Sequence, residues 1–390
     1  MTQALALYIH WPFCLSKCPY CDFNSHVREK INESLWQETL LKELNYFGNL
    51  TKGRLLKSVF FGGGTPSLMA PKTVASLLEK LSDYWQLQDD LEITLEANPT
   101  SIEANKFREF KNAGINRVSV GIQALRDQDL KFLGRTHGRD DALKALTIAR
   151  NNFERFSFDL IYARPQQTVK QWQEELKEAL ALAQGHLSLY QLTIEQGTAF
   201  YTAHQRKDFT VPDDYLAADL YEATQEMMEK AGLPAYEISN HASPGQESRH
   251  NLVYWQGQDY VGVGPGAHGR LTFDNEKFSF KETRAPEVWI KAVVEKGHGI
   301  DEKVKLSVED IFTERLMMGL RLREGIPRKD LEDLSGGREF ETLFQNSALE
   351  ILRAENLIKW NEDNFKLTAE GLQKLNGVLT FLLRNLAPIF

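Results

Sequence analysis

Short runs of β-branched and aromatic residues recur at regular intervals along the first half of the chain, and stretches with apolar residues at helical spacing separate them. The six runs are Leu5–His10, Ser58–Phe61, Glu92–Leu95, Arg117–Gly121, Phe156–Tyr162 and Leu187–Ile194. The helical stretches are Asn32–Phe47, Pro71–Tyr84, Ile102–Ala113, Arg126–Phe132, Arg139–Asn151 and Val169–Leu182. Strand and helix alternating in this way predict a parallel sheet with crossover helices.

Six strand–helix units are fewer than the eight that close a complete barrel. We therefore predict an α/β fold, a partial (β/α)6 barrel with one open side, formed by residues 1–200. In such sheets the loops and helix N-termini converge at the C-terminal ends of the strands, and ligands bind there. Residues that carry chemistry are expected at these strand ends.

The alternation then stops. Residues 201–305 contain one helical pattern, Asp213–Ala231, followed by a stretch rich in glycine, histidine, tyrosine and tryptophan. Because this part shows no further strand–helix units, we expect it to extend the barrel and to link it to the last part of the chain.

From residue 306 two helical patterns, Val308–Arg323 and Phe340–Glu355, precede a hairpin, Leu357–Leu367, and a last helix, Thr368–Leu386. Two helices followed by a hairpin are typical of winged-helix-like domains, so residues 306–390 are predicted to form a separate α+β domain. Its basic side chains are offset by acidic neighbours, which disfavours DNA binding. A cap over the barrel mouth or a surface for a partner is expected instead.

Composition places the chain among ordinary globular proteins, with 42% hydrophobic and 26% charged residues. The net charge of −8 disfavours a broad phosphate-binding surface, so no nucleic-acid partner is expected. No window approaches the roughly 18 apolar residues of a membrane-spanning helix, and no secretory signal is visible. We therefore expect a cytoplasmic protein without a membrane anchor of its own.

The cysteines carry the strongest chemical signal. The chain has 3 cysteines, Cys14, Cys18 and Cys21, directly after the first predicted strand. An odd number cannot form a closed disulfide framework, which indicates a reducing compartment. Three thiolates on one loop can bind three irons of a [4Fe–4S] cluster and leave the fourth iron to a small chelating molecule. The alternatives are unrelated buried thiols, or a zinc site completed by His10 or His26.

This loop resembles that of the radical S-adenosylmethionine (SAM) enzymes, in which the methionine moiety of SAM chelates the fourth iron. The wider segments Tyr8–Cys14 and Cys18–Phe23 are similar to those of the oxygen-independent coproporphyrinogen III oxidases and their relatives. The resemblance runs through the whole chain and is strongest in the first 200 residues. It implies a radical SAM barrel with a [4Fe–4S] cluster and SAM as cofactors. Oxidases of this family can hold two SAM molecules, and the number here is open.

The resemblance also gives roles to residues at the predicted strand ends. Taken singly, the glycines of Gly62–Thr65 are as consistent with an ordinary turn as with a binding site. For each polar residue the alternative is a surface or packing position. Together they match family positions around SAM, where the Arg135 guanidinium suits a carboxylate and the Glu96 carboxylate suits an ammonium or ribose. The implied SAM-binding residues are Tyr8, Tyr20, Gly63, Gly64, Thr65, Glu96, Gln123, Arg135 and Asp159.

Two departures from the oxidases put propionate decarboxylation in doubt. Phe23 stands where the oxidases have a further cysteine, and only a short segment precedes Cys14, where they have a long N-terminal arm. A third feature is the segment Arg249–Trp255, an HNxxYW motif that resembles the signature of a sister group, the radical SAM haem chaperones. In that group the motif histidine, here His250, is the proposed haem ligand. Imidazole binds haem iron and aromatic faces suit a porphyrin; the alternative is that His250 completes a buried network.

His268 is the second candidate for a haem ligand. It follows Gly262-x-Gly264-x-Gly266, which partly matches a dinucleotide fingerprint but lacks the required βαβ setting. We expect instead a tight turn that closes over the SAM pocket.

These features together predict a haem chaperone that binds haem as cargo on His250 and transfers it to haem-requiring apoproteins. Membrane contact would come through such an acceptor. The alternative is radical SAM decarboxylation of coproporphyrinogen III.

Overall fold

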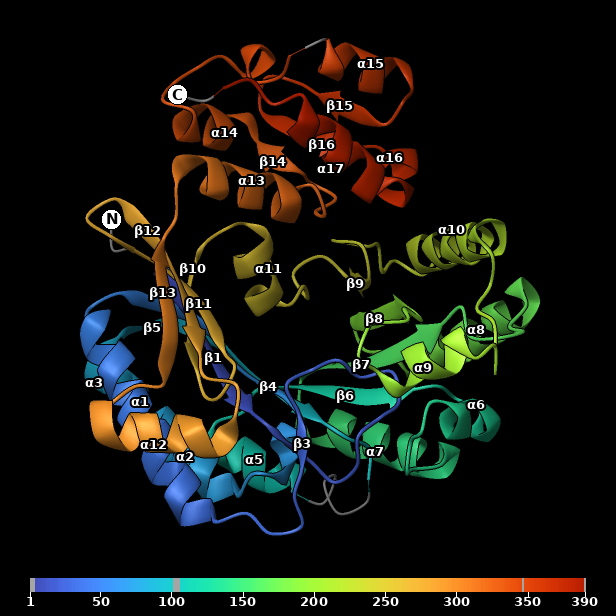
Figure 1. The fold of residues 1–390 in the computed structure, drawn as a ribbon. Helices are drawn as coiled ribbons and strands as arrows, with labels where there is room; N and C mark the ends of the chain where they lie inside the picture. The colour runs from blue at the N-terminus through green and yellow to red at the C-terminus, as the bar shows by residue number, and fades with distance from the viewer. Residues whose placement is uncertain (1–3, 101–105, 346, 389–390) are drawn as a thin grey trace.

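The computed structural model describes residues 4–100, 106–345 and 347–388. Their main sheet contains eleven strands (Figure 1). Six of these are parallel neighbours in chain order: β1 (Ala4–Trp11), β4 (Leu55–Gly63), β5 (Gln86–Ala97), β6 (Arg117–Gln123), β7 (Arg155–Tyr162) and β8 (His186–Gln191). Each corresponds to a strand expected from the sequence, so the predicted partial (β/α)6 architecture is confirmed.

The helices that connect these strands cover the outer face of the sheet (Figure 1). They are α1 (Glu33–Leu50), α2 (Pro71–Glu79), α3 (Leu81–Tyr84), α5 (Phe107–Ala113), α6 (Asp127–Phe132), α7 (Arg139–Asn152) and α8 (Val169–Leu182). The helix start expected at Ile102 lies outside the described residues. Gly114 ends α5 in the left-handed conformation, with φ of 113°, as a glycine after a helix commonly does.

The strands have an apolar outer face and a more polar inner face. In β1, Leu5, Leu7 and Ile9 belong to the main hydrophobic core, whereas Tyr8 and His10 line a cavity inside the barrel. Side chains two residues apart share one face of a strand. The alternation along β1 therefore decides which residues can reach a ligand.

The sheet continues beyond the six strands on both edges. On the β1 edge it adds parallel β10 (Asp259–Val263) and antiparallel β11 (His268–Phe273), β12 (Glu276–Glu282) and β13 (Ile300–Lys305). On the β8 edge it adds antiparallel β9 (Asn240–Ala242). The helices of this part are α9 (Ala199–Gln205), α10 (Asp214–Lys230), α11 (Arg249–Trp255) and α12 (Pro286–Lys296). The sequence predicted an extension of the barrel here but not these strands.

The C-terminal part has its own hydrophobic cluster and a small three-stranded sheet in the order β14-β16-β15. Its main elements are α13 (Val308–Gly319), β14 (Ile326–Pro327), α14 (Arg328–Leu334), α15 (Ala348–Ala354), β15 (Ile358–Trp360), β16 (Asn364–Leu367), α16 (Ala369–Gln373) and α17 (Leu375–Arg384). The predicted hairpin is confirmed, while β14 and α14 were missed. The predicted helix Phe340–Glu355 is only a short 3-10 turn, Phe340–Thr342, followed by α15.

No helix in the described part of the chain is long and apolar enough to cross a membrane.

Candidate functional site

The three cysteines lie on one loop at the C-terminal ends of the parallel strands. Cys14 ends β2 (Phe13–Cys14), which pairs with β3 (His26–Val27), and Cys18 and Cys21 lie between these strands. All three line a cavity of about 490 Å³, which we call the strand-end cavity. Its other walls include the ends of β4, β5, β6 and β7.

Hydrogen-bond donors surround the thiols. The Thr65 hydroxyl donates to Cys14 Sγ over 3.5 Å, and the Arg135 guanidinium donates to Cys18 Sγ over 3.2 Å. Burial raises the pKa of the Cys14 and Cys21 thiols, so positive charge such as that of a bound metal would hold them as thiolates. Within the described residues, no three His, Cys, Asp or Glu side chains are placed to share a single metal ion. Thiolates of an iron–sulfur cluster need not share one, because each binds a different iron.

Most of the residues predicted to bind SAM line the strand-end cavity together with the cysteines. These are Tyr20, Gly63, Gly64, Thr65, Glu96, Gln123, Arg135 and Asp159. Tyr8 is not among them, because its side chain lines a neighbouring cavity and its hydroxyl lies 3.0 Å from His10 Nδ1. The structure thus gathers at one edge of the sheet residues that are far apart in the sequence.

The two glycines at the end of β4, Gly63 and Gly64, are required by the close approach of the backbone to its neighbours. Gly63 has φ of 115°, and a Cβ there would lie 2.6 Å from the His10 ring. A Cβ on Gly64 would lie 2.7 Å from the Phe13 carbonyl oxygen. The amide of Gly64 donates to the Trp11 carbonyl over 2.7 Å, which holds the turn against the cysteine loop. A larger residue would therefore move the loop as well as enter the cavity.

The charged groups of the strand-end cavity favour a ligand that carries both signs of charge. Burial and the neighbouring Asp159 raise the pKa of Glu96 to about 8, and burial raises that of Asp159 to about 6. Such carboxyl groups would be stabilised in their charged form by a cation. Arg135 donates to Asn98 Oδ1 over 2.6 Å and to the Gly121 carbonyl over 2.9 Å, while its buried Nε has no partner among the described residues.

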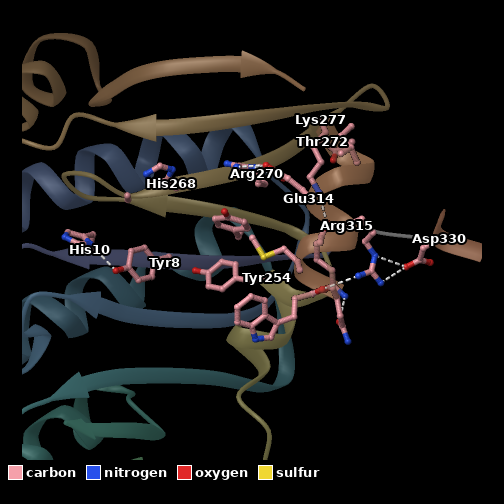
Figure 2. Close-up of a pocket in the computed structure, with 18 of the residues that line it drawn as sticks. Tyr8, His10, Tyr254, His268, Arg270, Thr272, Lys277, Glu314, Arg315 and Asp330 are labelled. Atoms are coloured by element: carbon pink, nitrogen blue, oxygen red, sulfur yellow. Dashed lines mark hydrogen bonds and ion pairs between the residues drawn. The ribbon is translucent and has the colours of Figure 1, made fainter. Parts of the chain in front are cut away.

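A second cavity of about 840 Å³ adjoins the first. Figure 2 shows residues that line this second cavity. We call it the hairpin cavity, because the β10–β11 hairpin forms one wall and α11, α13 and α14 form others. Phe23, Gly63 and Glu96 line both cavities. The aromatic residues of the hairpin cavity are Tyr8, Phe23, Tyr254, Trp255 and Tyr260. A molecule bound here would lie next to whatever occupies the strand-end cavity.

The two ends of the hairpin cavity differ in charge. Figure 2 shows Tyr8, His10 and His268 at one end, and Lys277 and Arg315 at the other. These cations and Arg270, which lies between the ends, are paired with acidic groups. Arg270 pairs with Glu314 at 2.8 Å, Arg315 with Asp330 at 2.9 Å, and Lys277 lies 3.8 Å from Asp259. One end therefore carries Tyr8 and two histidines, and the other carries paired charges.

The sequence analysis missed most of the residues that line the hairpin cavity. Tyr260, Arg270, Lys277, Glu314 and Arg315 come from segments that the fold alone brings together. A usable signal was the alternation of polar residues at positions 268, 270 and 272 after a glycine-rich turn, which is the period of a strand with one face in a cavity.

The glycine-rich turn before His268 lies elsewhere than expected. The sequence analysis expected it to close over the SAM pocket, but Gly266 and His268 line the hairpin cavity. Two hydrogen bonds hold the turn in place. The Gly264 amide donates to Glu43 Oε2 over 2.7 Å, and Asn24 Nδ2 donates to the Pro265 carbonyl over 2.9 Å.

His250 lies in a buried network rather than on a cavity wall. Its Nδ1 lies 2.9 Å from Ser58 Oγ and its Nε2 lies 2.7 Å from the Tyr254 hydroxyl. The ring stacks on Phe60, burial lowers its pKa to about 3, and it is 1% exposed. The motif reaches the hairpin cavity through Tyr254 and Trp255 instead. The alternative left open by the sequence, a buried network, thus describes His250 here, and a role as haem ligand would require the ring to leave both partners.

Comparisons with known proteins agree with this geometry. Residues 8–179 match the family model of the radical SAM superfamily, and residues 306–373 match that of the HemN C-terminal domain. The fold and the cysteine loop thus define a radical SAM protein. The chain belongs, more narrowly, to the HemN/HemW family of these proteins. Membership implies a [4Fe–4S] cluster and SAM.

The chain is similar to curated relatives over almost all of its length. It is 36% identical to heme chaperone HemW of Haemophilus influenzae, over 97% of this chain and 98% of that protein. It is 39% identical to the mitochondrial radical S-adenosyl methionine domain-containing protein 1 of Bos taurus, over 99% of this chain and 88% of that protein. The solved structure of coproporphyrinogen III oxidase (HemN) from Escherichia coli matches with a TM-score of 0.82 at 21% identity, covering 98% of this chain and 90% of that one, which shows a shared fold.

The pKa of Glu96 leads to a prediction about pH. SAM carries a sulfonium and an ammonium group, and a cation beside Glu96 favours its carboxylate. Because the pKa of Glu96 is about 8 without ligand, we expect SAM binding near pH 7 to release a proton, and SAM affinity to rise between about pH 6 and pH 8. Calorimetry in two buffers of different ionisation enthalpy measures this proton release. Glu96→Gln should abolish it, and equal affinity across this range without proton release would contradict the assignment.

Proposed function

We propose that this protein is a haem chaperone, which binds haem in the hairpin cavity and transfers it to haem-requiring apoproteins. The observation that carries the proposal is a cavity of about 840 Å³ with five aromatic residues in its walls, paired charged groups at one end, and a shared border with the strand-end cavity. Cavities of this size suit a large cofactor. Relatives of nearly the same length are named heme chaperone HemW.

The walls of the hairpin cavity match the parts of haem. Tyr254 and Tyr260 form an edge-to-face pair with ring centroids 4.5 Å apart, which offers aromatic surface to a porphyrin. Haem carries two carboxylates along one edge, and arginine binds carboxylates through paired N–H groups. These carboxylates would lie toward Lys277 and Arg315, with Arg270 between this end and the histidines.

In the strand-end cavity, Cys14, Cys18 and Cys21 would hold the cluster, SAM would chelate its open iron, and the cluster would supply one-electron chemistry. Arg135 would bind the carboxylate of SAM, and Glu96 and Asp159 its positive groups. Phe23 would stand between this site and the haem.

The second candidate function is oxidative decarboxylation of coproporphyrinogen III. The shared border of the two cavities at Phe23, Gly63 and Glu96 favours it, because it would bring a tetrapyrrole edge close to SAM. Phe23 in place of the oxidase cysteine favours the chaperone. The two functions predict different products from the same protein.

A haem titration beside a product assay separates the two functions. We expect the cluster-reconstituted protein to bind haem saturably, near one equivalent, in an anaerobic titration followed by the Soret band. With coproporphyrinogen III, SAM and dithionite we expect no protoporphyrinogen. Haem absorbance that rises without saturation would refute the chaperone, and protoporphyrinogen formation would establish the enzyme.

The acceptor proteins, the cytoplasmic location and the division into 1–200, 201–305 and 306–390 are part of the same proposal. Expressing residues 1–305 alone would test the last boundary.

A further inference from the structure

Two histidines line the hairpin cavity, and they differ in their bonding. His10 is buried, with Nδ1 at 3.0 Å from the Tyr8 hydroxyl and Nε2 at 2.9 Å from the Asn24 carbonyl. Both of its ring nitrogens are therefore occupied. His268 is exposed, and its ring nitrogens have no hydrogen-bond partner among the described residues. Of the two, only His268 presents a free imidazole to the cavity.

The backbone of His268 is held rigidly. His268 begins β11 and pairs with Lys281 of β12, the first of six residue pairs between these strands. A Cβ on Gly262 would lie only 2.1 Å from the His268 carbonyl oxygen, so this glycine lets β10 and β11 approach closely. The turn before it is fixed by Glu43 and Asn24. A ligand on such a rigid element is positioned before its metal arrives.

We propose that His268 is the axial ligand of the haem iron. This proposal rests on the proposed haem binding, and it assigns the iron to a residue outside the HNxxYW motif. In this arrangement Tyr254 and Trp255 of the motif form the wall against the porphyrin, while His250 supports that wall from behind through its contact with the Tyr254 hydroxyl.

Strand geometry supports this assignment. His268, Arg270 and Thr272 share one face of β11 and all line the cavity. Successive residues on one face of a strand are about 7 Å apart, so Arg270 lies beside the imidazole, in the direction of the charged end. An iron on His268 at the centre of the porphyrin would therefore place a propionate edge toward Arg270.

Arg270 keeps donors free for such a carboxylate. Its Nε and one terminal nitrogen donate to Glu314, and the other terminal nitrogen donates to the Gly269 carbonyl. A guanidinium has five N–H groups, so two of them, one on each terminal nitrogen, remain. A propionate can bind these while the Glu314 pair stays intact.

Matched substitutions test the assignment. His268→Gln, His250→Gln and, as a control outside both cavities, His204→Gln are each loaded with ferric haem in the cluster-reconstituted protein. Visible and electron paramagnetic resonance spectra report the iron ligand, and the titration gives the affinity. We expect only His268→Gln to lose the histidine-ligated spectrum and to bind haem roughly tenfold or more weakly. Added imidazole should restore its spectrum.

The outcomes separate this inference from the proposed function. If the parent protein binds haem saturably but the spectrum changes in His250→Gln and not in His268→Gln, the iron ligand is His250 and the inference is overturned. A parent spectrum without a histidine ligand overturns it too. If the parent binds no haem saturably, the proposed function itself fails.

Discussion

Serine in place of any one of Cys14, Cys18 and Cys21 is expected to abolish the [4Fe–4S] cluster. The chain has 3 cysteines, so no other thiol can replace the missing one. Each thiolate binds a different iron, and a serine hydroxyl is not deprotonated under the same conditions. After anaerobic reconstitution we expect the cluster absorbance, and the iron and sulfide bound, to fall nearly to the background level.

The loop offers its own control. Leu15 lies between the first two cysteines and is 59% exposed, so Leu15→Ser changes the same loop without removing a thiol. It should retain the full iron content. A cysteine variant that also keeps full iron and sulfide would show that the loop does not ligate the cluster.

The second large effect is expected for stability. His250→Ala should lower the free energy of unfolding by about 3 kcal/mol, because it leaves a space beside Phe60 and removes the hydrogen-bond partner of both Ser58 and Tyr254. An unsatisfied buried polar group costs about 1–3 kcal/mol. Urea unfolding followed by tryptophan fluorescence measures the change.

His268→Ala is the matched control for this prediction. Its side chain is exposed and has no hydrogen-bond partner among the described residues, so the free energy of unfolding should change by less than about 0.5 kcal/mol. Equal stability of His250→Ala and the parent would show that the network around His250 contributes nothing. The unfolding measurements on both variants also show whether a loss of haem binding in His250→Ala comes from loss of the fold.

The parallel part of the fold could be predicted from the sequence, and the extension could not. In strands such as β7, apolar Phe156, Phe158 and Leu160 alternate with polar residues, and this alternation marks the strand clearly in the sequence. Almost all residues of β13 are exposed, so no alternation of apolar and polar residues marks this strand in the sequence. β14 has only two residues, Ile326 and Pro327, which is too short for any periodic signal.

The strand-end cavity was largely predictable for a similar reason. Parallel strands bring their C-terminal ends to one edge, so the position of Glu96, Gln123 and Asp159 at those ends implies that they meet. The direction of a single side chain is harder to infer. Tyr8 and His250 were assigned to ligands by resemblance, and the sequence did not show that the Tyr8 hydroxyl would lie against His10 or the His250 ring against Ser58 and Tyr254.

The hairpin cavity could not be foreseen, because three distant parts of the chain build it. Tyr8 and Phe23 come from the first barrel unit, Tyr254 and Arg270 from the extension, and Arg315 from the C-terminal part. The packing of α13 against the extension, with the Arg270–Glu314 pair and the hydrogen bond from Arg315 to the Trp255 carbonyl, closes one side of the space. Sequence motifs indicate local chemistry, but they do not predict a cavity that distant segments form together.

A crystal structure of the protein with haem tests the central claim most directly. The account predicts haem in the hairpin cavity, with its iron on His268, its face against Tyr254 and a propionate at Arg270. Haem bound outside this cavity, with the hairpin cavity holding only solvent, would contradict it.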